Sequence, residues 1–137
     1  ELKDELAALA KQLGVENQVK LLGYRTDMME IMAASDIFVM PSFREGVPRA
    51  LLEAMDLGLP CVGSNTRGIR ELIGENGEGG YVCDPRSADT FAVAFEKLSS
   101  DAQTKEMMIA RNQMIVQQYS SETVREEMDL IYLQVLR

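Results

Sequence analysis

The sequence predicts an α/β fold, a Rossmann-like parallel sheet with helices on both faces. Short apolar runs alternate along the chain with segments whose apolar residues recur at helical spacing, which is the pattern of strand–helix units. Apolar runs such as residues 37–40 contain no polar residue, which favours strands that are covered on both faces. No internal repeat or linker interrupts the pattern, so we expect a single domain over residues 1–137.

The chain is expected to begin with a helix over residues 2–13, stopped by Gly14. Its leucines recur at helical spacing, at Leu2, Leu6, Leu9 and Leu13. A short strand is predicted over residues 19–22, ending at Gly23.

Asp27 can cap the next helix, which is brief and runs through Ala34. Three apolar side chains of this helix are expected to face inward: Met28, Ile31 and Met32. A second strand follows over residues 37–40.

A loop over residues 41–47 leads into a helix that starts near Pro48, a residue favoured in the first turn. We expect this helix to end at Gly58, because glycine commonly follows a helix C-terminus. A third strand over residues 61–63 is followed by a turn at 65–68 that opens a short helix.

The last part of the chain is predicted to be mainly helical. Residues 74–80 hold four glycines and form a loop, and residues 81–83 form a fourth strand that Asp84 and Pro85 stop. The three final helices are expected over residues 87–99, 101–118 and 122–136. Their candidate caps are Ser100 or Asp101 for the second helix and Ser120 or Ser121 for the third.

The composition is that of a soluble globular domain, because 46% of the residues are apolar and 26% are charged. A net charge of −8 argues against a general nucleic-acid binder, and any bound phosphate must be attracted locally by amides, a helix dipole or single arginines. The chain has no histidine, which is the commonest metal ligand and general base, so no metal site is expected. No apolar run approaches the roughly 20 residues that span a bilayer, so we expect neither a membrane span nor a signal peptide in this sequence.

Cys61 and Cys83 each lie in an apolar, strand-like run, and no Cys-x-x-Cys spacing occurs. We therefore expect buried free thiols in a protein of a reducing compartment. The chain opens at Glu1 directly into a helix, without a leading strand, which we interpret as a piece of a longer polypeptide.

Glu45 and Glu53, eight positions apart, are the most informative pair in the sequence. Glu45 closes the loop after an apolar strand, and Glu53 is expected about two turns into the following helix. Open α/β sheets bind ligands at the carboxyl ends of their strands. Two carboxylates beside a free helix N-terminus suit a ligand with hydroxyls at one end and phosphates in its middle, such as a nucleotide-sugar.

Two glycine-containing turns complete the candidate site. Gly46 has no side chain and lets the backbone approach a ligand closely. The turn over residues 65–69 again follows a strand and opens a helix, and such turns often place amides near a phosphate.

Each of these residues also has a simpler interpretation. Arg49 and Glu53 can form an ordinary surface pair worth a few tenths of a kcal/mol, and Glu45 can be a solvated acid that favours the helix dipole. Gly46 and Gly68 can mark turns with no ligand involved. Nearby arginines can be ordinary surface residues: Arg44, Arg67 and Arg70. Spacing alone therefore gives a candidate site and no more.

A longer series of motifs carries a family resemblance. It comprises Gly23-Tyr24, the stretch from Ala34 to Met55, Gly58 to Val62, Arg67 to Glu71, Asn76-Gly77 and Asp84-Pro85. Over roughly residues 1–100 the chain resembles the C-terminal, donor-binding half of family-4 retaining glycosyltransferases of the GT-B fold. The resemblance implies a nucleotide-sugar-binding domain over residues 1–137 that lacks the first strands of that half.

The resemblance also implies roles for single residues. Glu45, the candidate catalytic residue, touches hydroxyls of the donor sugar, and Glu53 holds the ribose hydroxyls. The backbone after Glu45 contacts the sugar and the diphosphate, and the turn at Arg67 and Gly68 borders the same cleft. The implied substrate-binding residues are Glu45, Gly46, Val47, Pro48, Arg49, Ala50, Glu53, Arg67 and Gly68. No cofactor and no metal are implied, because the nucleotide-sugar is a co-substrate and the family needs no Asp-x-Asp motif.

Two departures from the family pattern matter. Many relatives have a glycine where this chain has Pro48, so one backbone donor is missing, and Arg49 is an additional candidate contact to donor or acceptor. The basic residues that grip the diphosphate in the family, and its acceptor-binding domain, are expected upstream. The chain by itself is therefore not expected to catalyse transfer.

The function implied by the resemblance is transfer of a hexose from a UDP- or GDP-sugar to a glycan or lipid-linked acceptor in polysaccharide biosynthesis. It implies a cytoplasmic enzyme at the inner face of the membrane, with peripheral membrane association of the full-length protein and no nucleic-acid partner. The alternatives are a non-catalytic nucleotide-sugar-binding module, a GT-B epimerase or phosphorylase-like domain, and a purely structural domain. The last helix carries an apolar stripe that is expected to pack on a missing domain or to drive self-association: Val124, Met128, Ile131 and Val135.

Overall fold

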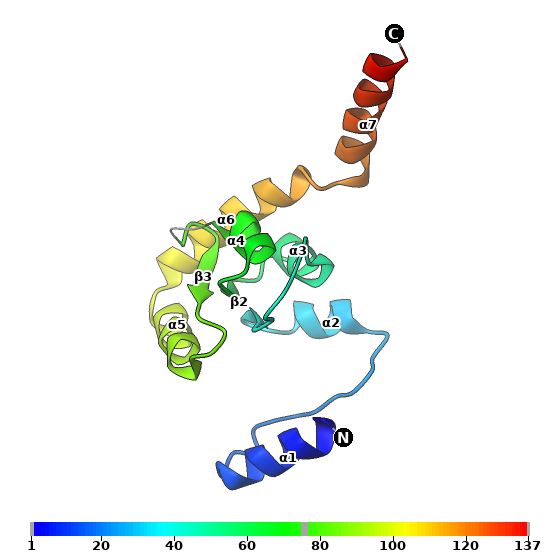
Figure 1. The fold of residues 1–137 in the computed structure, drawn as a ribbon. Coiled ribbons are helices and arrows are strands. Elements are labelled where there is room, and N and C mark those ends of the chain that lie inside the picture. Colours follow the sequence, from blue (N-terminus) through cyan, green and yellow to red (C-terminus); the bar gives the residue numbers. More distant parts are fainter. Residues whose placement is uncertain (1, 75–76, 137) are drawn as a thin grey trace.

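The computed structural model describes residues 2–74 and 77–136, and its centre is a three-stranded sheet (Figure 1). The strands are β1 (Phe38–Met40), β2 (Cys61–Ser64) and β3 (Gly80–Cys83). All three are parallel and are hydrogen-bonded in the order β1-β2-β3, with Val39 opposite Val62 and Val62 opposite Tyr81. The predicted parallel sheet and three of its four predicted strands are thus confirmed.

Seven helices are present in the described part of the chain. They are α1 (Leu2–Gln12), α2 (Met28–Ala33), α3 (Arg49–Asp56), α4 (Arg67–Ile73), α5 (Ala88–Ser100), α6 (Ala102–Gln117) and α7 (Ser121–Val135). Pro48 takes the N-cap position of α3 rather than its first turn. Of the candidate caps, Asp101 accepts a hydrogen bond from the Thr104 N–H (2.9 Å), and Ser120 accepts one from the Thr123 N–H (3.1 Å).

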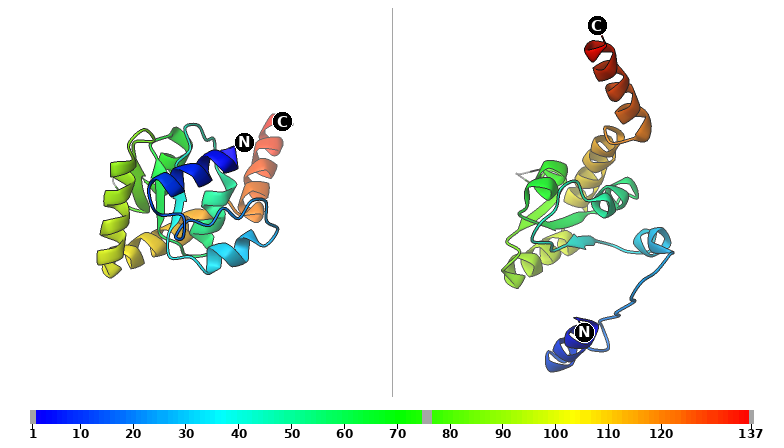
Figure 2. Two further views of the ribbon diagram at one scale, coloured as in Figure 1. Left: turned by 90° about the horizontal axis from the view of Figure 1, so that it is seen from below. Right: turned by 45° about the vertical axis from the view of Figure 1, so that its right-hand side comes forward.

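The helices cover both faces of the sheet, as the sequence predicts (Figure 2). Successive residues of a strand point to opposite faces, so Cys61 and Val62 belong to different cores. The core under α3 and α4 consists of Met32, Leu51, Ala54, Met55, Leu59, Cys61, Ile69, Leu72 and Ile73. The core under α5 consists of Val62, Cys83, Ala94, Leu98 and Met108. Cys61 and Cys83 are buried and free, as predicted.

Helix α6 links the two cores. Met108 belongs to the core under α5, whereas Val116, two turns further on, packs against the core under α3 and α4. Between them lies Asn112, which is completely buried and donates a hydrogen bond from Nδ2 to the Gly79 carbonyl at 2.7 Å. A buried amide needs such a partner, so this bond fixes α6 against the start of β3.

The strand predicted over residues 19–22 is absent from the described structure. A strand must hydrogen-bond to a neighbour, and the described sheet ends at β1, with no strand beside this segment. Val19 and Leu22 are accordingly 43% and 50% exposed. The loop predicted over residues 74–80 falls partly outside the described residues, at 75–76.

Two predictions about the α2 region are wrong. Asp27 occupies the N-cap position but makes no capping hydrogen bond, because its carboxylate accepts from the Arg25 guanidinium instead, with Nε at 2.7 Å. That bond also lowers the pKa of Asp27. Met28 faces outward and is 42% exposed, whereas Met32 is buried as predicted.

The first and last helices lie away from the sheet (Figures 1 and 2). The leucine stripe of α1 is exposed, and Ala10 is that helix's one buried residue. Helix α7 has no buried residue, and its apolar stripe is 42% to 76% exposed. Within residues 2–74 and 77–136, no helix combines the length and the apolar character needed to cross a membrane.

Candidate functional site

The N-terminus of α3 presents free amides at the carboxyl end of β1. The Leu51 and Leu52 N–H groups already donate to the Pro48 carbonyl, at 3.1 and 3.2 Å. The amides of Arg49 and Ala50 make no hydrogen bond within the described part of the chain. Two unpaired donors at the positive end of a helix dipole favour an anion.

Glu45 lies in the loop that leads from β1 to this helix end. Its side chain is half-buried and makes no hydrogen bond or ion pair with any residue that the structure describes. The next residue, Gly46, is exposed, and a Cβ built there meets no atom within 4 Å. The backbone at Gly46 therefore has open space beside it, which leaves room for the close approach of a ligand.

The turn that opens α4 packs directly against this loop. Gly68 is buried, and a Cβ built on it would lie 1.3 Å from the Gly46 carbonyl oxygen and 3.1 Å from that of Glu45. No side chain fits in that space, so glycine at position 68 allows the two backbones to touch. The structure thus brings together the two turns that the sequence assigns to one site.

Glu53 is the fifth residue of α3, about one turn into the helix rather than two. Its carboxylate lies 3.4 Å from the Arg49 guanidinium, and the two side chains are 37% and 91% exposed. The simpler interpretation of this pair is therefore correct in the free chain, although an exposed pair of this kind is weak enough for a ligand to displace. Glu53 also lines a cavity of about 310 Å³ together with Asp56 and Tyr119.

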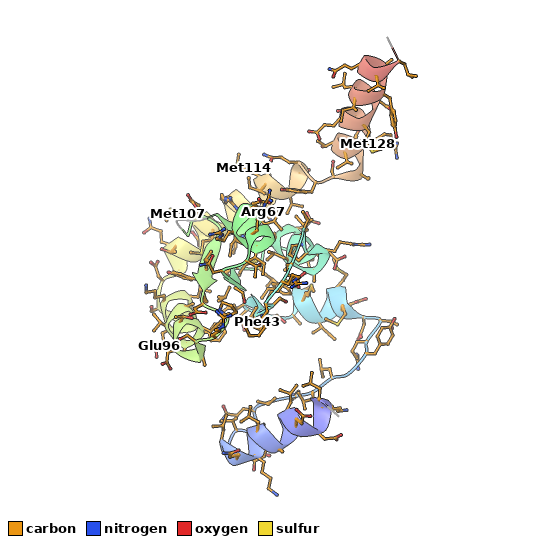
Figure 3. The ribbon with its side chains drawn as sticks, viewed as in Figure 1. Phe43, Arg67, Glu96, Met107, Met114 and Met128 are labelled. Atoms are coloured by element: carbon orange, nitrogen blue, oxygen red, sulfur yellow. The ribbon has the colours of Figure 1, made fainter. Side chains whose placement is uncertain are left out.

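Arg67 does not reach the Glu45 loop. Its Nε donates to the Glu71 carboxylate at 2.8 Å along the exposed side of α4, and this bond raises the pKa of Arg67. Figure 3 shows Arg67 on α4, apart from Phe43 in the loop after β1. The residues predicted for the site thus divide into a loop–helix unit around Glu45 and two exposed arginine–glutamate pairs.

A polar cavity of about 420 Å³ spans the carboxyl ends of the three strands, and we call it the strand-end cavity. It is lined by Phe43, Asn65, Thr66, Asp84, Pro85 and Arg86. The sequence analysis placed Asn65 and Thr66 in a turn of the candidate site, but it gave no ligand-binding role to the other four residues, Phe43, Asp84, Pro85 and Arg86. The signal that could have found them is their position, because each lies within three residues after a strand, and parallel strands end at one edge of a sheet.

The family model described as glycosyl transferases group 1 matches residues 1–114 of this chain. The chain belongs to this family. Its parallel sheet with helices on both faces is the fold expected for the C-terminal half of a GT-B glycosyltransferase.

Curated relatives of this group 1 glycosyltransferase domain include N-acetyl-alpha-D-glucosaminyl L-malate synthase of Bacillus anthracis. That protein is 33% identical over 94% of this chain and 34% of its own length. The lipopolysaccharide core biosynthesis glycosyltransferase LpsE of Rhizobium meliloti is 32% identical over 99% of this chain and 39% of its own length. The chain therefore spans between 34% and 39% of the length of these two relatives.

A similar solved structure is that of Anabaena HepE in complex with UDP. It superposes with a TM-score of 0.89 at 29% identity, covering 96% of this chain and 36% of HepE. HepE has also been crystallised with UDP-glucose, and that structure superposes with a TM-score of 0.85.

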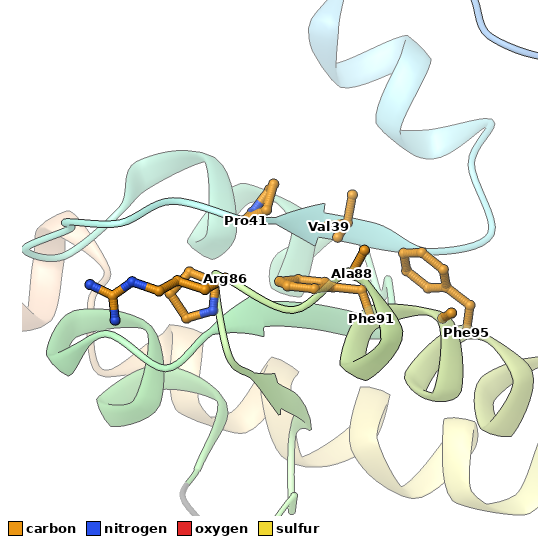
Figure 4. Close-up of a pocket in the computed structure, with 8 residues that line it drawn as sticks. Val39, Pro41, Arg86, Ala88, Phe91 and Phe95 are labelled. Carbon is orange, nitrogen blue, oxygen red and sulfur yellow. The ribbon is translucent and has the colours of Figure 1, made fainter. Parts of the chain in front are cut away.

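A third cavity of the glycosyltransferase domain, of about 580 Å³, is apolar and lies on the α5 side of β1. Phe91 and Phe95 of α5 face Val39 across it, and the Arg86 guanidinium points away from the rings (Figure 4). Among residues 2–74 and 77–136, no group of three or more acidic or cysteine side chains is placed to hold a metal ion.

Proposed function

We propose that this domain binds the nucleotide-sugar donor of a retaining glycosyltransferase, which transfers a hexose from a UDP- or GDP-sugar to a glycan or lipid-linked acceptor. The observation that carries the proposal is the open loop–helix unit, in which the free amides of Arg49 and Ala50 follow the exposed backbone of Gly46. The binding of UDP by HepE, a protein of similar structure, supports it.

The chemistry of transfer fits this arrangement. As the bond between sugar and diphosphate breaks, negative charge grows on the departing diphosphate, and fixed amides at a helix N-terminus stabilise that charge. The Glu45 carboxylate, which has no described partner, can accept hydrogen bonds from sugar hydroxyls and orient the ring. Glu53 accepts from the ribose hydroxyls, which requires only that its weak contact with Arg49 opens.

The proposal extends to the full-length protein in three respects. The acceptor is bound chiefly by residues outside this chain, and the protein contributes to polysaccharide biosynthesis. It works on the cytoplasmic side of the membrane, where the buried free thiols Cys61 and Cys83 remain reduced.

The test is calorimetric titration of the chain with UDP, GDP and UDP-glucose, repeated with the variants Glu53→Gln and Glu71→Gln. Both glutamates form an exposed pair with the arginine four residues before them, so Glu71→Gln is a matched control. We expect saturable binding that Glu53→Gln weakens about tenfold or more and Glu71→Gln leaves unchanged. Equal effects of the two variants, or no binding of any nucleotide at millimolar concentration, would contradict the proposal.

A further inference from the structure

The strand-end cavity contains a buried hydroxyl that the structure leaves without a partner. Thr66 Oγ1 is inaccessible to solvent and makes no hydrogen bond with any described residue. Ser64, the last residue of β2, is 0% exposed, and its hydroxyl is also unpartnered. Buried hydroxyls normally have partners, and an unpaired one lowers stability. Thr66 is only partly buried as a residue and lines the polar cavity, so rotation of its side chain brings the hydroxyl to a ligand bound there.

Taken together, the remaining polar side chains of the cavity offer both hydrogen-bond donors and hydrogen-bond acceptors. Asp84 accepts only, and one of its oxygens is already used by the Arg86 N–H at 2.9 Å. The Arg86 guanidinium donates only and has no partner among the described residues, whereas the Asn65 amide does both. A sugar hydroxyl is donor and acceptor at once, so this mixture suits a ligand with several hydroxyls.

Phe43 adds an apolar surface to the same cavity. Its ring is 69% exposed, which is unusual for a phenylalanine, and it lies two residues before Glu45 in the loop after β1. The C–H face of a pyranose ring packs well on an aromatic ring, while the hydroxyls at its edge reach polar groups.

Two other ligand classes fit less well. Because the Asp84 carboxylate offsets the charge of the Arg86 guanidinium, the cavity has no net positive charge to attract a phosphate or carboxylate group. A divalent cation needs several oxygen ligands of negative charge, whereas this cavity offers one carboxylate beside a guanidinium. The volume, about 420 Å³, is in the range of small-ligand sites.

We propose that the strand-end cavity binds the pyranose ring of a neutral sugar. The inference rests on the proposed function and deepens it, because Phe43 and Glu45 share a loop and the cavity therefore lies at the sugar end of the donor. The ring belongs either to the donor itself or to the acceptor.

The test uses Thr66→Val and Phe43→Leu, with Thr26→Val, an exposed threonine outside the cavity, as the matched control. Amide NMR and calorimetry would compare UDP, UDP-glucose, and the methyl glycosides of glucose, galactose and N-acetylglucosamine with UDP present. If the ring is the donor's, UDP-glucose binds more tightly than UDP, and Thr66→Val and Phe43→Leu lower that gain about five- to tenfold. If it is the acceptor's, a methyl glycoside shifts the Phe43 and Asn65 amides, and the same variants weaken its binding by a similar factor.

Folding defects can be separated from lost contacts. The Thr66 side chain makes no capping bond to α4, so valine at this position is expected to leave Tm unchanged or raise it. UDP affinity should be unchanged in both cavity variants and in Thr26→Val. UDP binding without any sugar-dependent effect overturns this inference and leaves the proposed function standing. If Thr66→Val lowers the affinity for UDP by the same factor as the affinity for UDP-glucose or a methyl glycoside, the cavity binds the nucleotide. That result likewise overturns the inference. Failure of the wild-type chain to bind any nucleotide overturns the proposed function instead.

Discussion

The buried Gly68 of α4 touches the backbone of Gly46 so closely that a Cβ at position 68 would lie 1.3 Å from the Gly46 carbonyl oxygen. The obstacle is backbone rather than the flexible end of a side chain, so it cannot move aside without shifting the whole loop. Gly68 thus determines where the loop that carries Glu45 lies relative to the N-terminus of α3.

We expect Gly68→Ala to displace this loop. UDP affinity should fall at least tenfold, and the free energy of unfolding should fall by about 1 to 3 kcal/mol because the added methyl overpacks a buried contact. Calorimetry and urea denaturation would measure the two effects. Wild-type affinity in a folded Gly68→Ala chain would show that the contact does not position the site.

Gly46→Ala provides the complementary case. Gly46 has a negative φ and open space around the position of a Cβ, so alanine should leave the free energy of unfolding within about 0.5 kcal/mol of wild type. If a diphosphate approaches this backbone closely, the same methyl lowers UDP affinity by more than fivefold. The combination of intact stability with reduced binding is the expected result, and unchanged binding would place the phosphates elsewhere.

Ionisation of Cys61 is expected to make the free energy of unfolding depend on pH in the alkaline range. Burial raises the pKa of its thiol from 9.0 to about 12, so the folded chain keeps a proton that the unfolded chain loses. The resulting stability is fully present below pH 9 and is lost as the pH rises toward 12, at about 1.4 kcal/mol per pH unit.

Cys61→Ala isolates this effect from lysine and tyrosine titration. The variant should be less stable than wild type at pH 8, because it leaves a small cavity in the core under α3 and α4. The difference between the two chains should shrink by about 1.6 kcal/mol between pH 9 and pH 10.5 in urea denaturation. Parallel pH profiles for both proteins would contradict the assignment.

Helix α7 is expected to make the chain self-associate. Its apolar stripe is exposed from Val124, at 42%, to Val135, at 76%, and covering it removes apolar surface from water. The mean mass from light scattering should rise with concentration, and Ile131→Glu should return it to the monomer. Glu126→Ala, on the opposite side of the helix, should have no such effect. A mean mass that stays at the monomer value at every concentration would contradict the prediction.

Local sequence predicted most of the fold. Apolar runs bounded by glycine, proline and capping residues form strands where a neighbouring strand is present, and they form helices where a core is present to cover them. It failed at residues 19–22, where the apolar run has no strand beside it in the described structure. It also failed at Asp27, because the competing partner Arg25 lies two residues away and no propensity rule ranks the two interactions.

The candidate site divides in the same way. Glu45, Gly46 and the helix start at Arg49 are close in sequence, so their arrangement could be predicted. The positions of residues 43, 65–66 and 84–86 just after strands predict only that they lie at one edge of the sheet, and their grouping into one cavity depends on strand register and loop conformation. The contact between Gly68 and Gly46 is of the same kind, since their closeness depends on how α4 docks.

Asn112 joins α6 to β3 through one buried hydrogen bond, and its removal should show how strongly that bond stabilises the fold. Asn112→Ala leaves the Gly79 carbonyl unpaired in a site that water does not reach and adds a small cavity, so we expect a loss of about 2 to 4 kcal/mol in urea denaturation. Gln113→Ala, exposed on the same helix, should change stability by less than about 0.5 kcal/mol. Because Asn112 contacts none of the residues proposed to bind the donor, UDP affinity of the folded variant should equal that of wild type. A loss no larger than that of Gln113→Ala would mean that the bond contributes little to holding α6 on the sheet.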